Sequence, residues 1–79
     1  MHNIRNLATN KKLQSVYNLL LKKSMVPNWM IVEKCHVINP GGVVSEINAQ
    51  IKNFGQKIYC IKVYTKKKKY HFYNLKINI

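Results

Sequence analysis

The chain has 79 residues, 47% of them apolar, and it carries 14 Lys and Arg residues against two acidic ones, Glu33 and Glu46. This length predicts a single small domain with one core, and the apolar fraction argues against a disordered chain. The formal charge of +12 destabilises a compact state by self-repulsion, so we expect an anionic partner: nucleic acid, an anionic membrane surface or an acidic protein.

The first predicted element is a helix that follows a flexible N-terminal arm, residues 1–8. Thr9 or Asn10 can cap this helix, which is expected to run from Lys11 to about Lys23. Its apolar residues recur at helical spacing and are expected to be buried. They are Leu13, Val16, Tyr17, Leu20 and Leu21.

A second helix is expected from Pro27 to His36, after a connection over Ser24–Asn28. Pro27 suits the first turn of a helix, because N–H groups in that turn have no acceptor within the helix and proline therefore loses no hydrogen bond there. One stripe of this helix contains Trp29, Val32, Cys35 and His36, but Met30 and Ile31 leave the choice of buried face open. We expect Trp29 in the core, together with Tyr17 and Tyr73.

The third helix is expected over Val43 to Phe54, after a turn at Val37–Gly42, and Gly55 is placed to end it. The residues that should face the core are Val44, Ile47, Ile51 and Phe54. The opposite face should carry Ser45, Ala49, Lys52 and Asn53, with Glu46 and Gln50 to one side. This outer face is small, polar and nearly free of negative charge.

The C-terminal part alternates with a period of two and predicts a β-hairpin. The first strand is expected over Lys57–Tyr64, the turn over Lys66–Lys69, and the second strand from Lys69 to about Leu75. Residues 76–79 are expected either to extend the second strand or to fray. The lysines at the turn would form a basic tip.

The order of these elements resembles a winged helix-turn-helix. Residues 51–58, IKNFGQKI, resemble the segment Leu-Arg-x-x-Gly-x-x-Ile that ends the third helix in small phage-type domains of this family, and Tyr73-Asn74-Leu75 resembles their closing Tyr-x-Leu. By position, Lys52, Gly55 and Ile58 match the basic residue, the glycine and the first core residue of the wing. The chain departs from the pattern at Asn48, where the family often has a buried aliphatic residue, and Ile47 is expected to fill that space.

The resemblance covers Leu13 to Leu75, within a predicted domain of residues 9–77. It implies an α+β fold with three helices followed by a two-stranded wing, and a DNA-binding protein of phage or mobile-element type. Such a protein would act as a transcriptional regulator or an excisionase-like architectural factor, with the third helix in the major groove of double-stranded DNA and the basic wing on the backbone. The expected nucleic-acid-binding residues are Ser45, Ala49, Gln50, Lys52 and Asn53 on the helix, Lys57, Lys62, Lys66, Lys67, Lys68 and Lys69 on the hairpin, and Arg5, Lys11 and Lys12 near the N-terminus.

Base reading follows from the side-chain chemistry of the third helix. Asn53 and Gln50 could bond adenine, Ser45 most bases and Lys52 guanine or phosphate, whereas Ala49 would permit close approach. Glu46 would be unfavourable near phosphate unless it accepts from a cytosine amine or caps the helix. Lysines at the hairpin tip would contact phosphates without reading sequence.

Two other binding classes stay open, together with a homodimer that would read two half-sites. An adaptor or inhibitor that docks an acidic protein would expose apolar surface, such as Trp29, Met30 and Ile31. An RNA-binding domain would stack bases on Tyr59 or Tyr70.

Catalysis, cofactors and membrane insertion are not expected. Two isolated glutamates form no acid/base pair, and there is no glycine-rich phosphate loop. Zinc ligands could be imagined among Cys35, His36, Cys60 and His71, but their spacing fits no known motif. Without a signal peptide or a run of about 20 apolar residues, an intracellular, cytoplasmic protein is expected, associated with the nucleoid if it binds DNA.

Overall fold

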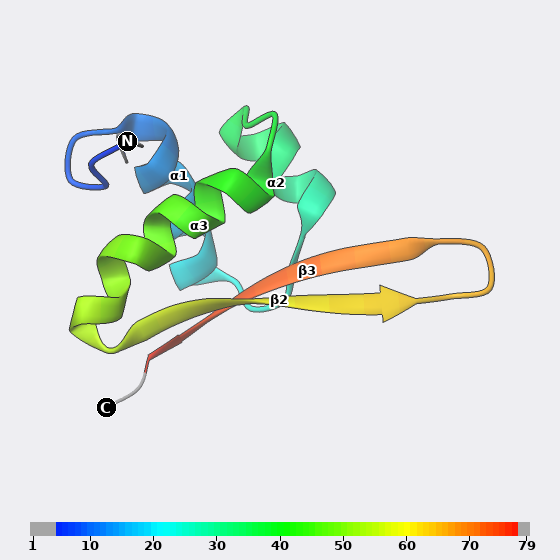
Figure 1. The fold of residues 1–79 in the computed structure, drawn as a ribbon. Coiled ribbons are helices and arrows are strands. Elements are labelled where there is room, and N and C mark those ends of the chain that lie inside the picture. Colours follow the sequence, from blue (N-terminus) through cyan, green and yellow to red (C-terminus); the bar gives the residue numbers. More distant parts are fainter. Residues whose placement is uncertain (1–4, 78–79) are drawn as a thin grey trace.

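The computed structural model describes residues 5–77 and shows an α+β fold in which three helices lie on one side of a three-stranded antiparallel sheet (Figure 1). The elements are α1 (Lys11–Lys22), β1 (Val26–Pro27), α2 (Asn28–Cys35), α3 (Pro40–Ile51), a 3₁₀ turn η1 (Lys52–Phe54), β2 (Gln56–Tyr64) and β3 (Lys69–Ile77). The distal part of the β2–β3 hairpin projects beyond the helices. The predicted α+β class and the three helices are confirmed, but the sheet has a third strand.

The ends of the helices follow local chemistry. The side chain of Asn10 accepts hydrogen bonds from the backbone N–H groups of Lys12 and Leu13, at 3.0 and 3.1 Å, and so caps α1. Asn39 caps α3 by accepting from the N–H of Gly42, and Pro40 occupies the first turn. As a result, α3 begins three residues earlier than the predicted Val43.

Gly55 ends the helical segment as predicted, but the α-helix itself stops three residues before the predicted Phe54. The α-helix proper stops at Ile51, and the tighter turn η1 carries the chain to Gly55. The φ angle of this glycine is 71°, in the left-handed region that residues with a side chain rarely adopt.

The third strand, β1, is the element that the sequence did not predict. Val26 pairs with Tyr73 and Pro27 with Phe72, so β3 lies between β1 and β2. A strand of two residues is too short to show an alternating pattern, and this segment was expected to be a connection. Pro27 therefore belongs to the sheet and precedes α2, which begins at Asn28.

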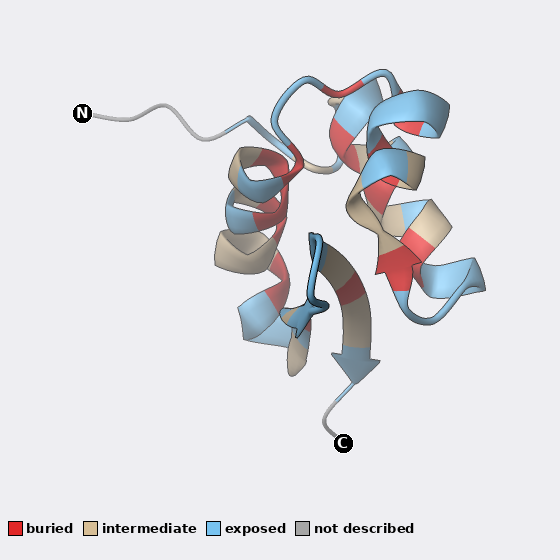
Figure 2. Cartoon of the chain, turned by 90° about the vertical axis from the view of Figure 1, so that its right-hand side faces the viewer, coloured by how far each residue is buried: buried red, intermediate tan, exposed pale blue. Residues whose placement is uncertain are grey.

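The core lies between the helices and the inner face of the sheet (Figure 2). Its buried residues are Leu13, Val16, Leu20, Val26, Ile31, Cys35, Val37, Val43, Val44, Ile47, Ile51, Ile58 and Tyr73. Tyr73 and Ile47 are buried as predicted. Tyr17 is half-buried and its hydroxyl donates a hydrogen bond to the side chain of Gln56.

Three large apolar residues that were expected in the core are exposed. Trp29 is 59% exposed because α2 buries Ile31 and Cys35, which lie on another face of that helix. Phe54 is 75% exposed because it belongs to η1, whose 3₁₀ winding turns its side chain away from the stripe of α3. Leu21 is exposed because α1 packs through Leu13, Val16 and Leu20.

Asn48 locks α3 to the start of the hairpin. Its side-chain oxygen accepts a hydrogen bond from the N–H of Ile58 at 2.7 Å, and its side-chain nitrogen donates to the carbonyl of Ile58 at 3.0 Å. One amide therefore satisfies both backbone groups of a buried strand residue. The polar residue at this position is structural, and it fixes where β2 leaves α3.

Substituting Asn48 by alanine is expected to lower the free energy of unfolding by about 1–3 kcal/mol, because both backbone groups of Ile58 lose their partner. Urea denaturation followed by circular dichroism measures this change. The matched control is Asn53→Ala, which removes the same side chain from an exposed position and should leave stability nearly unchanged. Equal stability of the two variants would show that the Asn48 amide does not hold the hairpin.

Candidate nucleic-acid interface

The outer face of α3 and the start of β2 together form an open hollow of about 450 Å³. Ser45 and Lys52 are exposed in it, and Ala49 is half-buried. The residues that line it are Ser45, Asn48, Ala49, Lys52, Gly55, Gln56 and Lys57. None of them is acidic, so the hollow carries no negative side chain, and its lysines lie at the end nearest the hairpin.

Four of the predicted residues are thus brought together, and three others join them. Asn48 and Gln56 were not predicted there, and their side chains are already engaged by Ile58 and Tyr17. A helical repeat counted from Ser45 through Ala49 and Lys52 could have identified Asn48 as a neighbour. The polar groups of this hollow that the fold does not use in those contacts are on Ser45, Lys52 and Lys57.

Gln50 lies on another side of α3, where the N-terminal segment docks. Its side-chain oxygen accepts from the N–H of Leu7 at 2.7 Å, and its side-chain nitrogen donates to the carbonyl of Arg5 at 2.7 Å. Gln50 therefore binds backbone of this chain, although it was predicted to read bases. Residues 5–8 of the predicted arm lie against α3 through these contacts, whereas residues 1–4 lie outside the described residues.

Arg5 and Glu46 form a bidentate ion pair beside the contact between Gln50 and the N-terminal segment. The guanidinium of Arg5 donates to both carboxylate oxygens of Glu46, at 2.9 and 3.0 Å. The hydrogen bond from Arg5 is the main cause that lowers the pKa of Glu46, and the same contact raises the pKa of Arg5. The carboxylate of Glu46, which was expected to disfavour phosphate, is therefore neutralised within the chain. The guanidinium of Arg5 is engaged in this ion pair.

This ion pair predicts a pH dependence of stability. Because the folded state lowers the pKa of Glu46, the pair stabilises the protein above the unfolded carboxyl pKa of about 4.3. The contribution is lost as the pH falls through the lower pKa of the folded state. Unfolding curves at a series of pH values should show that Glu46→Gln is less stable than the parent at neutral pH, with the difference vanishing in acid.

Glu33→Gln is the matched control, since it makes the same change in net charge on α2, and Glu33 forms no ion pair within residues 5–77. We expect it to change the acid dependence less than Glu46→Gln does. Identical pH profiles for the two variants would rule out a contribution from the Arg5–Glu46 pair.

The predicted basic residues of the hairpin are all exposed. Lys57 and Lys62 lie on β2, and Lys66–Lys69 form the tip and the first residue of β3. The tip is closed by Thr65, whose N–H donates to the carbonyl of Lys68 at 2.8 Å and whose hydroxyl accepts from the Lys68 N–H at 3.0 Å. The tip lysines thus project from a hydrogen-bonded turn.

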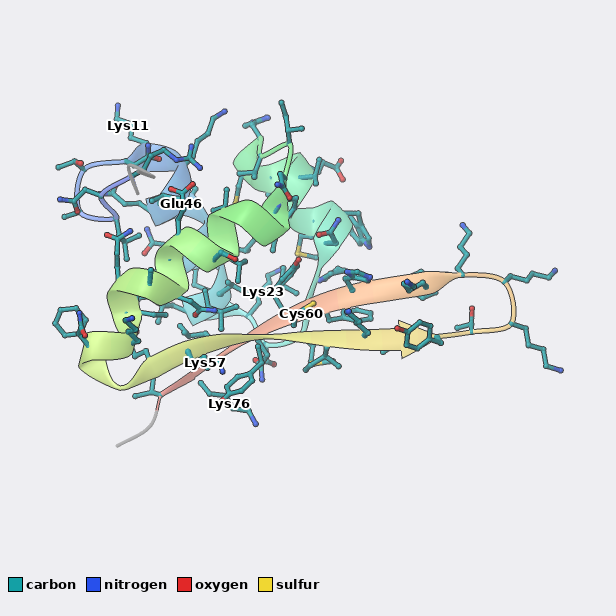
Figure 3. The ribbon with its side chains drawn as sticks, viewed as in Figure 1. Lys11, Lys23, Glu46, Lys57, Cys60 and Lys76 are labelled. Carbon is teal, nitrogen blue, oxygen red and sulfur yellow. The ribbon has the colours of Figure 1, made fainter. Side chains whose placement is uncertain are left out.

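The remaining predicted residues lie at the edges of this surface. Lys11 and Lys12 are exposed in the first turn of α1, and Figure 3 shows Lys11 on the same side as Glu46 of α3. Lys12 lines a second hollow with Asn39 and Gly42, at the start of α3. Asn53 is exposed in η1 but does not line the hollow beside Ser45. Basic residues therefore flank the outer face of α3 at both of its ends.

Within residues 5–77, no three His, Cys, Asp or Glu side chains gather closely enough to hold a metal ion. Cys35 is buried, which raises the pKa of its thiol, and Cys60 is exposed on β2. Among the helices in this part of the chain, none has both the length and the apolar character needed to cross a membrane.

No protein-family model, curated protein or solved structure shows a significant match to this chain.

Proposed function

We propose that this protein binds double-stranded DNA as a small winged helix-turn-helix, with α3 in the major groove and the β2–β3 hairpin as the wing. The observation that carries the proposal is the outer face of α3, which has no free carboxylate, has lysines at both ends and lies beside a hairpin with a basic tip. The major groove, about 12 Å wide, admits one α-helix.

Two residues of α3, Ser45 and Ala49, and the first residue of η1, Lys52, have roles in this proposal. Ala49 is small enough for the helix to approach base edges and to touch a thymine methyl group. Ser45 bonds a base edge, and Lys52 bonds guanine or a phosphate. The hairpin lysines contact phosphates, which adds affinity without sequence information.

The biological role that fits this chemistry is a transcriptional regulator or an architectural factor of phage or mobile-element type. The protein needs no cofactor and is not an enzyme in this proposal. If four to six phosphates are neutralised, the log–log dependence of affinity on salt should have a slope of roughly −4 to −5.

Lys52→Glu tests the proposed interface. It should weaken binding to a labelled duplex by roughly tenfold or more, because it places a carboxylate where the groove would lie. Fluorescence anisotropy at two salt concentrations measures the affinity, and selection from a randomised duplex pool measures sequence preference. The matched control is Lys34→Glu on α2, which changes the net charge equally but lies on the surface between α1 and α2.

Equal losses in the two variants would mean that α3 is not the contact surface and that net charge alone governs binding. Salt-dependent binding without an enriched motif would favour the architectural role over the regulator. No duplex binding near physiological salt would overturn the proposal.

The exposure of Trp29 favours a second candidate function, the docking of an acidic protein. Trp29 lies with Asn28 at the start of α2, in a hollow of about 340 Å³ that Lys69, Tyr70 and His71 also line. An exposed tryptophan among basic groups suits an acidic segment with an apolar anchor. A shift of Trp29 fluorescence on addition of polyglutamate, with no duplex binding, would favour this candidate over the first.

A further inference from the structure

The outer face of the hairpin, opposite the helices, carries a row of aromatic and aliphatic side chains. The helices pack against the other face of the sheet, where Ile58 and Tyr73 are buried (Figures 1 and 2). Because alternate residues of a strand share a face, the outer face consists of Lys57, Tyr59, Ile61 and Val63 of β2 and Tyr70, Phe72, Asn74 and Lys76 of β3.

The strand register makes this row continuous. Ile61 pairs with Phe72 and Val63 with Tyr70, while Tyr59 lies one pair further along, opposite Asn74. Residues on one face of a strand follow each other at about 6.8 Å, and directly paired side chains are about 5 Å apart. Tyr59 is 37% exposed and Tyr70 39% exposed, although both strands are fully paired with each other. The face therefore offers two accessible rings, with Phe72 half-buried between them, and Tyr70 also lines the hollow beside Trp29 of α2.

Positive charge lies at both ends of the row. The ammonium groups of Lys57 and Lys76 lie 5.0 and 5.4 Å from the centre of the Tyr59 ring. Figure 3 shows both lysines on the side of the hairpin away from the helices. The lysines of the tip lie beyond the other end, next to Val63 and Tyr70. Residues 56–77 contain no Asp or Glu.

The positive charge of these lysines limits which kind of partner can bind the outer face of the hairpin. A second copy of the chain would bring two lysine-rich hairpins together, which like-charge repulsion opposes at a net charge of +12 for each copy. Aromatic rings flanked by lysines are instead the two features with which proteins hold unpaired bases and their phosphates. The spacing of the rings along the hairpin suits an extended strand that lies along it.

We propose that this outer face binds single-stranded nucleic acid, with bases stacked on Tyr59, Phe72 and Tyr70 and with phosphates held by Lys57, Lys76 and the tip lysines. In the bound state the phosphates draw the two ammonium groups away from the Tyr59 ring, which frees a ring face for a base. Stacking tolerates any base, so binding has little sequence preference. The stacking rings lie outside the hollow beside α3, although Lys57 and the tip lysines also belong to the proposed duplex interface, and single-strand binding does not depend on duplex binding there.

The test uses the full chain and a labelled oligothymidylate of about 12 nucleotides, read by fluorescence anisotropy. Tyr59→Leu keeps an apolar side chain but removes the ring, and it should weaken binding on the order of tenfold. Tyr59→Phe keeps the ring and should bind as the parent does. The matched control is Tyr64→Leu, because Tyr64 is an exposed tyrosine on the opposite face of the same hairpin.

Equal effects of Tyr59→Leu and Tyr64→Leu would overturn the proposal, as would failure of the parent to bind either oligothymidylate or oligouridylate. Binding of the parent to anionic phospholipid vesicles but to neither oligonucleotide would also overturn it. Oligouridylate in place of oligothymidylate tells whether RNA or DNA is preferred, and binding of either at this face supports the proposal.

A duplex probe keeps this proposal distinct from the first. Tyr59→Leu should leave duplex affinity unchanged, whereas Lys52→Glu should lose it. Loss of duplex binding in Tyr59→Leu, without loss of oligothymidylate binding, would place the outer face in duplex recognition and overturn the single-strand assignment.

Discussion

Replacing Ile47 by alanine is expected to lower the free energy of unfolding by about 2–5 kcal/mol, because the substitution leaves a cavity beneath α3. The side chain of Ile47 is fully buried, at 0% exposure, in the core between the helices and the sheet. A domain of this size has a total stability of only about 5–15 kcal/mol, so the substitution should remove a large part of it. Thermal and urea unfolding followed by circular dichroism measure the loss.

Ser45→Ala is the control on the same helix. Ser45 is exposed, and its substitution should change stability by no more than about 0.5 kcal/mol. If Ile47→Ala unfolded no more readily than Ser45→Ala, α3 would present a different face to the core. The residues assigned to its outer face would then be wrong as well.

If the protein binds duplex DNA as proposed, neutralising the tip of the hairpin should have the largest effect on the salt dependence of that binding. In the triple variant Lys66→Gln, Lys67→Gln, Lys68→Gln, the log–log salt slope should fall by about 0.9 for each phosphate that the protein no longer neutralises. All sequences should weaken alike, because phosphate contacts carry no sequence information. Titration of one labelled duplex at a series of salt concentrations measures the slope.

The matched control is the triple variant Lys22→Gln, Lys23→Gln, Lys34→Gln, which makes the same change in net charge at the C-terminal end of α1 and on α2. Lys22 and Lys34 line a hollow between those helices, away from the hairpin tip. If both variants flattened the slope equally, the hairpin would not be a phosphate clamp. The effect would then report overall charge.

Patterns within a few residues predicted the local structure well. The cap at Asn10, the left-handed glycine Gly55 and the alternation of β2 and β3 all depend on neighbours in the chain. Local patterns predicted burial less well where the α-helix α3 gives way to the 3₁₀ turn η1. Phe54 was placed on the stripe of α3 by counting at α-helical spacing, and the 3₁₀ winding of η1 put it outside the core.

The candidate site was predicted in part, since Ser45, Ala49, Lys52 and Lys57 share one hollow. Gln50 could not be placed correctly from spacing, because its partners lie 43 and 45 residues away in the N-terminal segment. The neutralisation of Glu46 could not be predicted from spacing either, because its partner Arg5 is 41 residues away in the chain. Both contacts depend on how the segment before α1 docks on α3.

The sequence by itself therefore determined the helices, the hairpin, most of the core and the excess of positive charge, because each is encoded in composition or in short-range periodicity. Only the tertiary structure decided the strand β1, the exposure of Trp29, the role of Asn48 and the partners of Gln50 and Glu46. These features arise from hydrogen bonds and packing between segments far apart in the chain. Such contacts leave no periodic trace in a single sequence.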